Sequence, residues 1–85
     1  MQALVKFERT AKGLHPSQAS VIFSTIEGTK EIILDRSFLT EDHFTAFIIR
    51  RDGSNFLVEL PSETSDGCWR VTVPAENVRS EQLAA

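Results

Sequence analysis

The sequence predicts an all-β (mainly β) domain, built as a small antiparallel sheet of about five to six strands. Three observations predict this fold class. Apolar and polar residues alternate with a period of two in several short segments, which is typical of half-buried strands. Turn-forming residues recur between these segments at intervals of about 8 to 12 residues. Finally, Asp52-Gly53 stands between two hydrophobic runs, and Gly accepts the positive φ that a hairpin turn requires.

The N-terminal half supplies the first expected elements. Strands are expected at residues 3–9, 19–26 and 31–35. Residues 10–18 are expected to form a loop, because Gly13 and Pro16 interrupt the alternation. The turn at 27–29 joins the second and third strands into a hairpin. The segment 36–42 fits either a short helical turn or a loop that buries an apolar plug.

The C-terminal half is expected to add three strands, at residues 44–50, 56–60 and 69–73. The first two flank the Asp-Gly turn, and a polar, solvated loop at 61–67 separates the second from the third. Pro74 suits the first position of a short 3₁₀ or helical turn, since its missing N–H has no partner there in any case. Residues 1–78 are therefore expected to form one domain, followed by a frayed tail at 79–85.

The order of elements from residue 44 to residue 78 is strand, Asp-Gly hairpin, strand, polar loop, Trp-containing strand, Pro-initiated turn and Val. This order resembles the C-terminal half of SH3-like small barrels, whose final strands are joined by a 3₁₀ turn. The resemblance covers about 35 residues and concerns a fold, so it implies an SH3-like barrel and carries no functional residues.

The core is expected to combine the more apolar faces of these strands. It would consist of Phe7, Val21, Phe23, Ile32, Leu34, Phe44, Ile48, Val58, Trp69, Val71 and Val73. The single cysteine, Cys68, cannot form an intramolecular disulfide, which favours a reducing compartment. The sequence shows neither the apolar stretch of a signal peptide nor a run long enough to span a membrane. The expected location is cytoplasmic, away from the membrane.

Catalytic and metal-binding patterns are missing from the sequence. His43 follows Asp42, but neighbouring side chains on an extended chain point to opposite faces, so His43 is expected to be a solvated loop residue. One cysteine and two widely separated histidines give no zinc-type spacing. The four glycines each stand alone, which excludes a glycine-rich phosphate loop. We therefore expect a protein that is not an enzyme and uses no cofactor or metal.

Two groups of residues are candidates for binding. Arg50 and Arg51 open the hairpin turn, and Trp69-Arg70 lies on a strand expected nearby, so these four side chains can line one edge of the barrel. Alternatively, the arginines pair with acidic neighbours and Trp69 caps the core. The second group, Phe47, Ile49 and Leu57, is expected on the second face of the central hairpin, where a homodimer partner or a loop such as 36–42 would cover it.

These groups lead to two functional hypotheses. The first is a small non-catalytic protein-interaction module that binds a protein partner or a second copy of itself. The alternative is a small β-barrel that binds single-stranded nucleic acid through the arginines and Trp69. The chain has nine basic and twelve acidic residues and a net charge of −3, which opposes binding to phosphate backbones. Nucleic acid is therefore the less favoured partner.

Overall fold

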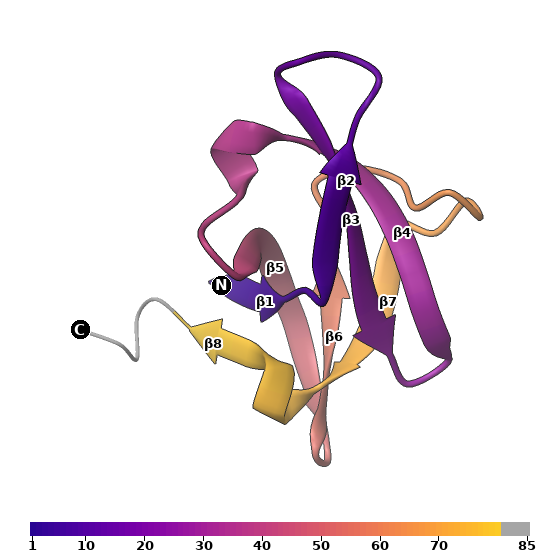
Figure 1. The fold of residues 1–85 in the computed structure, drawn as a ribbon. Helices are drawn as coiled ribbons and strands as arrows, with labels where there is room; N and C mark the ends of the chain where they lie inside the picture. Colours follow the sequence, from indigo (N-terminus) through magenta and orange to yellow (C-terminus); the bar gives the residue numbers. More distant parts are fainter. Residues whose placement is uncertain (81–85) are drawn as a thin grey trace.

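The computed structural model of the chain describes residues 1–80, which form strands and two short 3₁₀ helices (Figure 1). The elements are β1 (Gln2–Lys6), β2 (Arg9–Lys12), β3 (Gln18–Thr25), β4 (Gly28–Asp35), η1 (Arg36–Phe38), β5 (His43–Asp52), β6 (Asn55–Glu59), β7 (Arg70–Pro74), η2 (Ala75–Asn77) and β8 (Val78–Ser80). They form two antiparallel sheets, one of five strands and one of three. The mainly β class is thus confirmed, but the chain divides its strands between two sheets.

The five-stranded sheet has the order β7-β6-β5-β1-β8, so the N-terminal strand lies between β5 and the last strand. The Asp-Gly hairpin forms as expected: β5 pairs with β6, and Gly53 has a φ of 59°. Pro74 precedes η2, which carries the chain from β7 into β8. Arg79 and Ser80 pair with β1, so ordered structure extends past the point where the tail was expected to begin. Residues 81–85 lie outside the described residues.

The three-stranded sheet has the order β2-β3-β4. Its β3–β4 hairpin confirms the pairing expected for residues 19–35, and Gly28 at the turn has a φ of 117°. The strand expected at 3–9 is instead two strands, because the chain leaves the larger sheet after Lys6 and enters the smaller one at Arg9. Part of the expected loop at 10–18 therefore belongs to β2.

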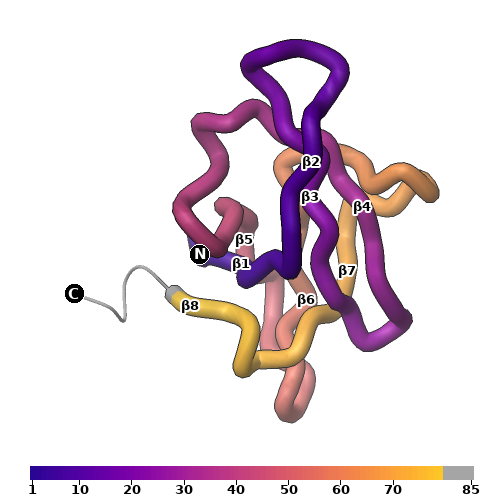
Figure 2. Tube along the Cα trace, in the orientation of Figure 1, coloured from indigo at the N-terminus to yellow at the C-terminus, as the bar shows by residue number. Residues whose placement is uncertain are grey.

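A backbone contact joins the two sheets at the end of β3. The Ile26 amide, just after β3, donates to the Thr72 carbonyl on β7 (3.0 Å). Strand β3 packs on β7, and the smaller sheet lies in front of β6 and β7 in the tube view (Figure 2). These contacts hold the sheets together, but the described residues do not close into a barrel.

The core fills the space between the sheets. It consists of Val5, Val21, Phe23, Ile32, Leu34, Phe44, Ala46, Val58, Leu60, Val71 and Val73. The Phe23 and Phe44 rings meet edge to face with centroids 5.0 Å apart, a favourable aromatic geometry. Phe7 and Ile48 are partly buried against this core. Trp69 was wrongly expected in the core, because β7 begins only at Arg70 and the Trp69 side chain remains 54% exposed.

The loops carry more structure than expected. Segment 36–42 begins with η1, in which the Asp35 carboxylate accepts from the Ser37 amide, and the half-buried Leu39 packs against the core. The loop at 61–67 was expected to be polar and solvated, but Thr64 is buried and bridges to Ile32 on β4. The Ser65 amide also donates to the Glu31 carbonyl (2.9 Å). Both segments therefore close the ends of the core.

Candidate functional surface

The candidate surface is the side of the five-stranded sheet that faces away from the core. In the ladder, Phe47 on β5 lies opposite Glu59 on β6, which lies opposite Arg70 on β7. Residues directly opposite each other share a face of a sheet. The neighbouring row of paired residues points to the other side of the sheet, toward the core, and consists of Ile48, Val58 and Val71. We call the surface formed by Phe47, Ile49, Arg50, Asp52, Leu57, Glu59 and Arg70 the outer face.

A β-bulge in β5 determines which residues reach the outer face. The register shifts between Ile48 and Arg50, so Ile49 is the extra residue of the strand. Strict alternation from Ile48 would place Arg50 on the inner side. The bulge instead pairs Arg50 with Leu57, and it moves Arg51 to the inner side opposite Phe56. Nothing in the alternation of apolar residues signals this shift, because residues 47–49 are all apolar.

The outer face carries exposed apolar side chains. Phe47 is 52% exposed and Ile49 is 41% exposed, while Leu57 is half-buried between its neighbours. None of these three side chains belongs to the core cluster. Segment 36–42 contacts β5 through Leu39, which bridges to Phe44. Phe44 lies near the start of β5, away from the bulge at Ile49. Exposed apolar side chains gathered on one sheet face are typical of an interaction site.

Ion pairs balance the charge around these apolar residues. The Arg50 Nε lies 3.4 Å from the Asp52 carboxylate, and the Arg70 guanidinium lies 3.1 Å from the Glu59 carboxylate. Both pairs are exposed to solvent, so each contributes little to stability, about 0 to 1 kcal/mol. These pairs matter more for the charge of the surface. Two cations and two anions surround the apolar patch, so the outer face has no net charge.

The four residues expected along one edge do not come together. The Arg51 guanidinium lies over the Phe56 ring, 5.3 Å from its centroid, and its Nε donates to the Gly53 carbonyl (2.9 Å). Arg51 is thus on the opposite side of the hairpin from Arg50. Trp69 precedes the β7 ladder, and its carbonyl accepts from the Leu60 amide (2.8 Å). Only Arg50 and Arg70 therefore share the outer face.

His43 differs from the expectation for a solvated loop histidine. It is the first residue of β5, and its side chain is largely buried. Its Nδ1 lies 2.6 Å from the Asp42 carboxylate, and this hydrogen bond lowers the pKa of Asp42. The pair forms because Asp42 lies in a bend rather than in extended chain, so the opposite-face rule does not apply to it.

The remaining chemically reactive groups of residues 1–80 are placed as follows. Within this range, no group of three or more His, Cys, Asp or Glu side chains is placed to hold a metal ion. Cys68 is half-buried and packs against the core. None of the helices in the described part of the chain has the length and apolar character needed to cross a bilayer. Comparison of the chain with known protein families, with characterised proteins and with solved structures finds no match.

Proposed function

We propose that this protein is a small non-catalytic interaction module that self-associates through the outer face. The observation that carries the proposal is the position of Phe47 and Ile49, which lie exposed on a sheet face whose opposite side is already packed. Removing apolar surface from water stabilises a complex in proportion to the area buried. A rigid strand pair presents these side chains with little further ordering on binding.

The balanced charge of the outer face favours a second copy of the chain as the partner. In a two-fold symmetric dimer, both copies use the same surface. If one residue of the first copy contacts a second residue of its partner, the same two residues also meet with the copies exchanged. The outer face carries Arg50 and Arg70 together with Asp52 and Glu59, so two copies meet without an excess of like charge. A strongly basic or strongly acidic partner would instead require a face that carries an excess of the opposite charge.

We also propose that the two sheets have an SH3-like arrangement and that the protein works in the cytoplasm. An SH3-like arrangement is supported by the Asp-Gly hairpin of β5 and β6, followed by β7 and by the 3₁₀ helix η2 that leads into β8. A cytoplasmic setting is supported by the single cysteine, because the chain cannot rely on an internal disulfide. Neither point alters which residues form the outer face.

Sedimentation velocity over a wide range of protein concentration tests the proposal. The unaltered chain should sediment as a dimer at high concentration, and Phe47→Glu should sediment as a monomer because it places a charge in the apolar patch. Leu14→Glu is the matched control, since Leu14 is 82% exposed in the β2–β3 loop and lies outside the outer face. Dissociation by both substitutions, or a monomeric unaltered chain, would contradict the proposal.

A further inference from the structure

A second surface feature lies in the loop between β2 and β3, at the opposite end of the molecule from the β5–β6 turn (Figure 1). Here the loop and the first residue of η1 line a cavity of about 440 Å³ that is open to solvent. This volume falls within the range of about 300 to 1,000 Å³ typical of small-molecule sites. The cavity is lined by Lys12, Gly13, Leu14, His15, Pro16, Gln18 and Arg36.

The cavity lining is cationic and has no carboxylate. Lys12 and Arg36 supply full positive charges, and neither forms an ion pair with any acidic residue in the described range 1–80. Residues 9–26 contain no Asp or Glu, although the chain as a whole carries a net charge of −3. The nearest acidic residue in sequence is Asp35, whose carboxylate accepts from the Ser37 amide in η1. The positive charge here is therefore not neutralised by its own loop.

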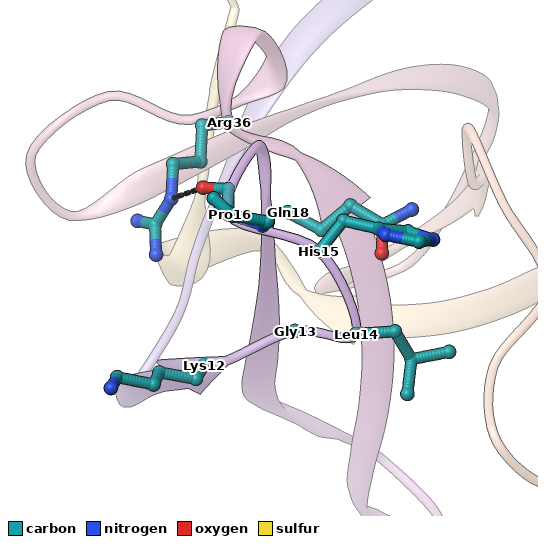
Figure 3. A pocket seen from close by; sticks show the side chains of 7 residues that line it. All are labelled: Lys12, Gly13, Leu14, His15, Pro16, Gln18 and Arg36. Atoms are coloured by element: carbon teal, nitrogen blue, oxygen red, sulfur yellow. Dashed lines mark hydrogen bonds between the residues drawn. The ribbon is translucent and has the colours of Figure 1, made fainter.

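Arg36 is held in place against the loop. Its Nε donates to the Pro16 carbonyl (3.1 Å), and its backbone amide donates to the Ser17 carbonyl (2.8 Å). Figure 3 shows Arg36 and Lys12 extending toward the same side of the loop. Because Nε is used for the loop, the terminal nitrogens of the guanidinium point away from Pro16 and can donate to an anion. Arg36 is thus held in place by the loop, and Lys12 adds a second positive charge on the same side of the loop.

The loop itself is tightly built. A Cβ added at Gly13 would lie 2.7 Å from the Gln18 Cβ, so only glycine allows the two sides of the loop to approach this closely. The Gln18 amide donates to the His15 carbonyl (3.0 Å). The Gln18 side-chain oxygen is buried without a hydrogen-bond donor from the described residues. This oxygen is shielded by the loop, so the anion is expected to contact Lys12 and Arg36 and not Gln18.

We propose that this cavity binds a small molecule that carries an oxyanion, either a phosphate or a carboxylate. Lys12 and Arg36 would hold the oxyanion through charge-assisted hydrogen bonds. The site is separate from the outer face and does not depend on self-association. It adds a small-molecule ligand to a module otherwise assigned to protein contacts.

The experiment follows backbone amide chemical shifts while inorganic phosphate or succinate is added, with sodium chloride keeping the ionic strength constant. Saturable shifts should be confined to the backbone amides of residues 12–15, 17–18 and 36. A stronger response to phosphate assigns the site to phosphorylated ligands, a stronger response to succinate assigns it to carboxylates, and equal responses assign it to oxyanions in general.

Two variants test whether the cavity residues hold the anion. Lys12→Gln should weaken binding about tenfold, because it removes one charge-assisted hydrogen bond. Arg36→Lys keeps the charge but loses the bond to Pro16, so it should also weaken binding. Arg9→Gln is the matched control, since it removes a charge from the same strand outside the cavity lining. Shifts that do not saturate, or equal weakening by Arg9→Gln and Lys12→Gln, would overturn the proposal.

Discussion

Phe44 lies at the centre of the contact between the two sheets. Its side chain is fully buried, its ring packs edge to face on Phe23, and its backbone pairs with Val5 on β1. Truncation to alanine removes this aromatic contact and leaves a cavity between the sheets. Phe44→Ala should therefore lower the free energy of unfolding by about 3 to 5 kcal/mol. A chemical denaturation curve measures the change.

Phe38→Ala is the control for that experiment. Phe38 lies in η1 and is exposed, so its truncation should cost less than about 1 kcal/mol. Equal losses for Phe38→Ala and Phe44→Ala would show that the contact between the sheets is not the main source of stability.

Asp66 fastens the 61–67 loop to β4. Its carboxylate accepts from the Lys30 ammonium (2.5 Å) and from the Thr64 hydroxyl (2.5 Å), and the Thr64 hydroxyl in turn accepts from the Cys68 amide (2.8 Å). These two hydrogen bonds, first Lys30 and then Thr64, lower the pKa of Asp66 from its usual 3.8 to about 2. The same contact with Asp66 raises the pKa of Lys30 above 10.5.

The shifted pKa of Asp66 predicts a pH dependence of stability. A lowered pKa means that the carboxylate stabilises the fold above pH 3.8 and that this contribution is lost as the pH falls toward 2. Asp66→Asn should therefore flatten the stability profile between these two pH values. Denaturation midpoints measured across this range check the prediction. Glu63→Gln, which removes another carboxylate of the same loop, should leave the slope in place; if both variants behave alike, the Lys30 contact is not its cause.

At the scale of elements, the β2–β3 hairpin depends on the close approach at Gly13. The nearest atoms to an added Cβ are the Gln18 Cβ at 2.7 Å and the Gln18 carbonyl carbon at 2.9 Å, and a backbone atom cannot move aside cheaply. Gly13→Ala should force the hairpin apart, at a cost of about 1 to 3 kcal/mol. Hydrogen exchange should show faster exchange in β2, with little change in β6.

Gly53→Asn is the comparison for that prediction. Gly53 has a φ of 59° and open space around it, and asparagine tolerates the left-handed conformation. The substitution should therefore leave exchange in β2 unchanged. Protection of β2 that survives Gly13→Ala would contradict the steric account of the hairpin.

Hairpins were the elements that the sequence predicted best. The β3–β4 and β5–β6 pairs form as expected, because alternation and the glycine turns are local signals. The bulge at Ile49 and the division of 3–9 into β1 and β2 were not predicted. Both depend on how distant strands pair: β1 is held by β5 and β8, and β2 by β3. A single alternating pattern carries no information about such partners.

The candidate surface was predicted only in part for the same reason. Alternation placed Phe47 and Leu57 on one face, and the ladder brings them there. The position of Trp69 depends on where β7 begins, and the separation of Arg50 from Arg51 depends on the bulge. The small cavity at Arg36 was also missed, because it joins η1 to a loop about 20 residues earlier through tertiary hydrogen bonds.

At the scale of the whole molecule, the charge distribution predicts weak binding to nucleic acid. The net charge is −3, and Arg50 and Arg70 already contact carboxylates. Three phosphate contacts would give a salt slope of only about −2 to −3. Titrating the fluorescence of the exposed Trp69 with single-stranded DNA and RNA should show no sub-micromolar binding at physiological salt. Tight binding that disappears in an Arg50→Gln, Arg51→Gln double variant would favour the nucleic-acid alternative.

We expect two copies of the chain to meet through the outer face. The most direct measurement mixes isotope-labelled with unlabelled protein and records only the nuclear Overhauser contacts between copies. Contacts are expected from the Phe47 ring of one copy to the Ile49 and Leu57 methyl groups of the other. Contacts confined to another surface, such as the Leu14 loop, or no contacts between copies at high concentration, would contradict it.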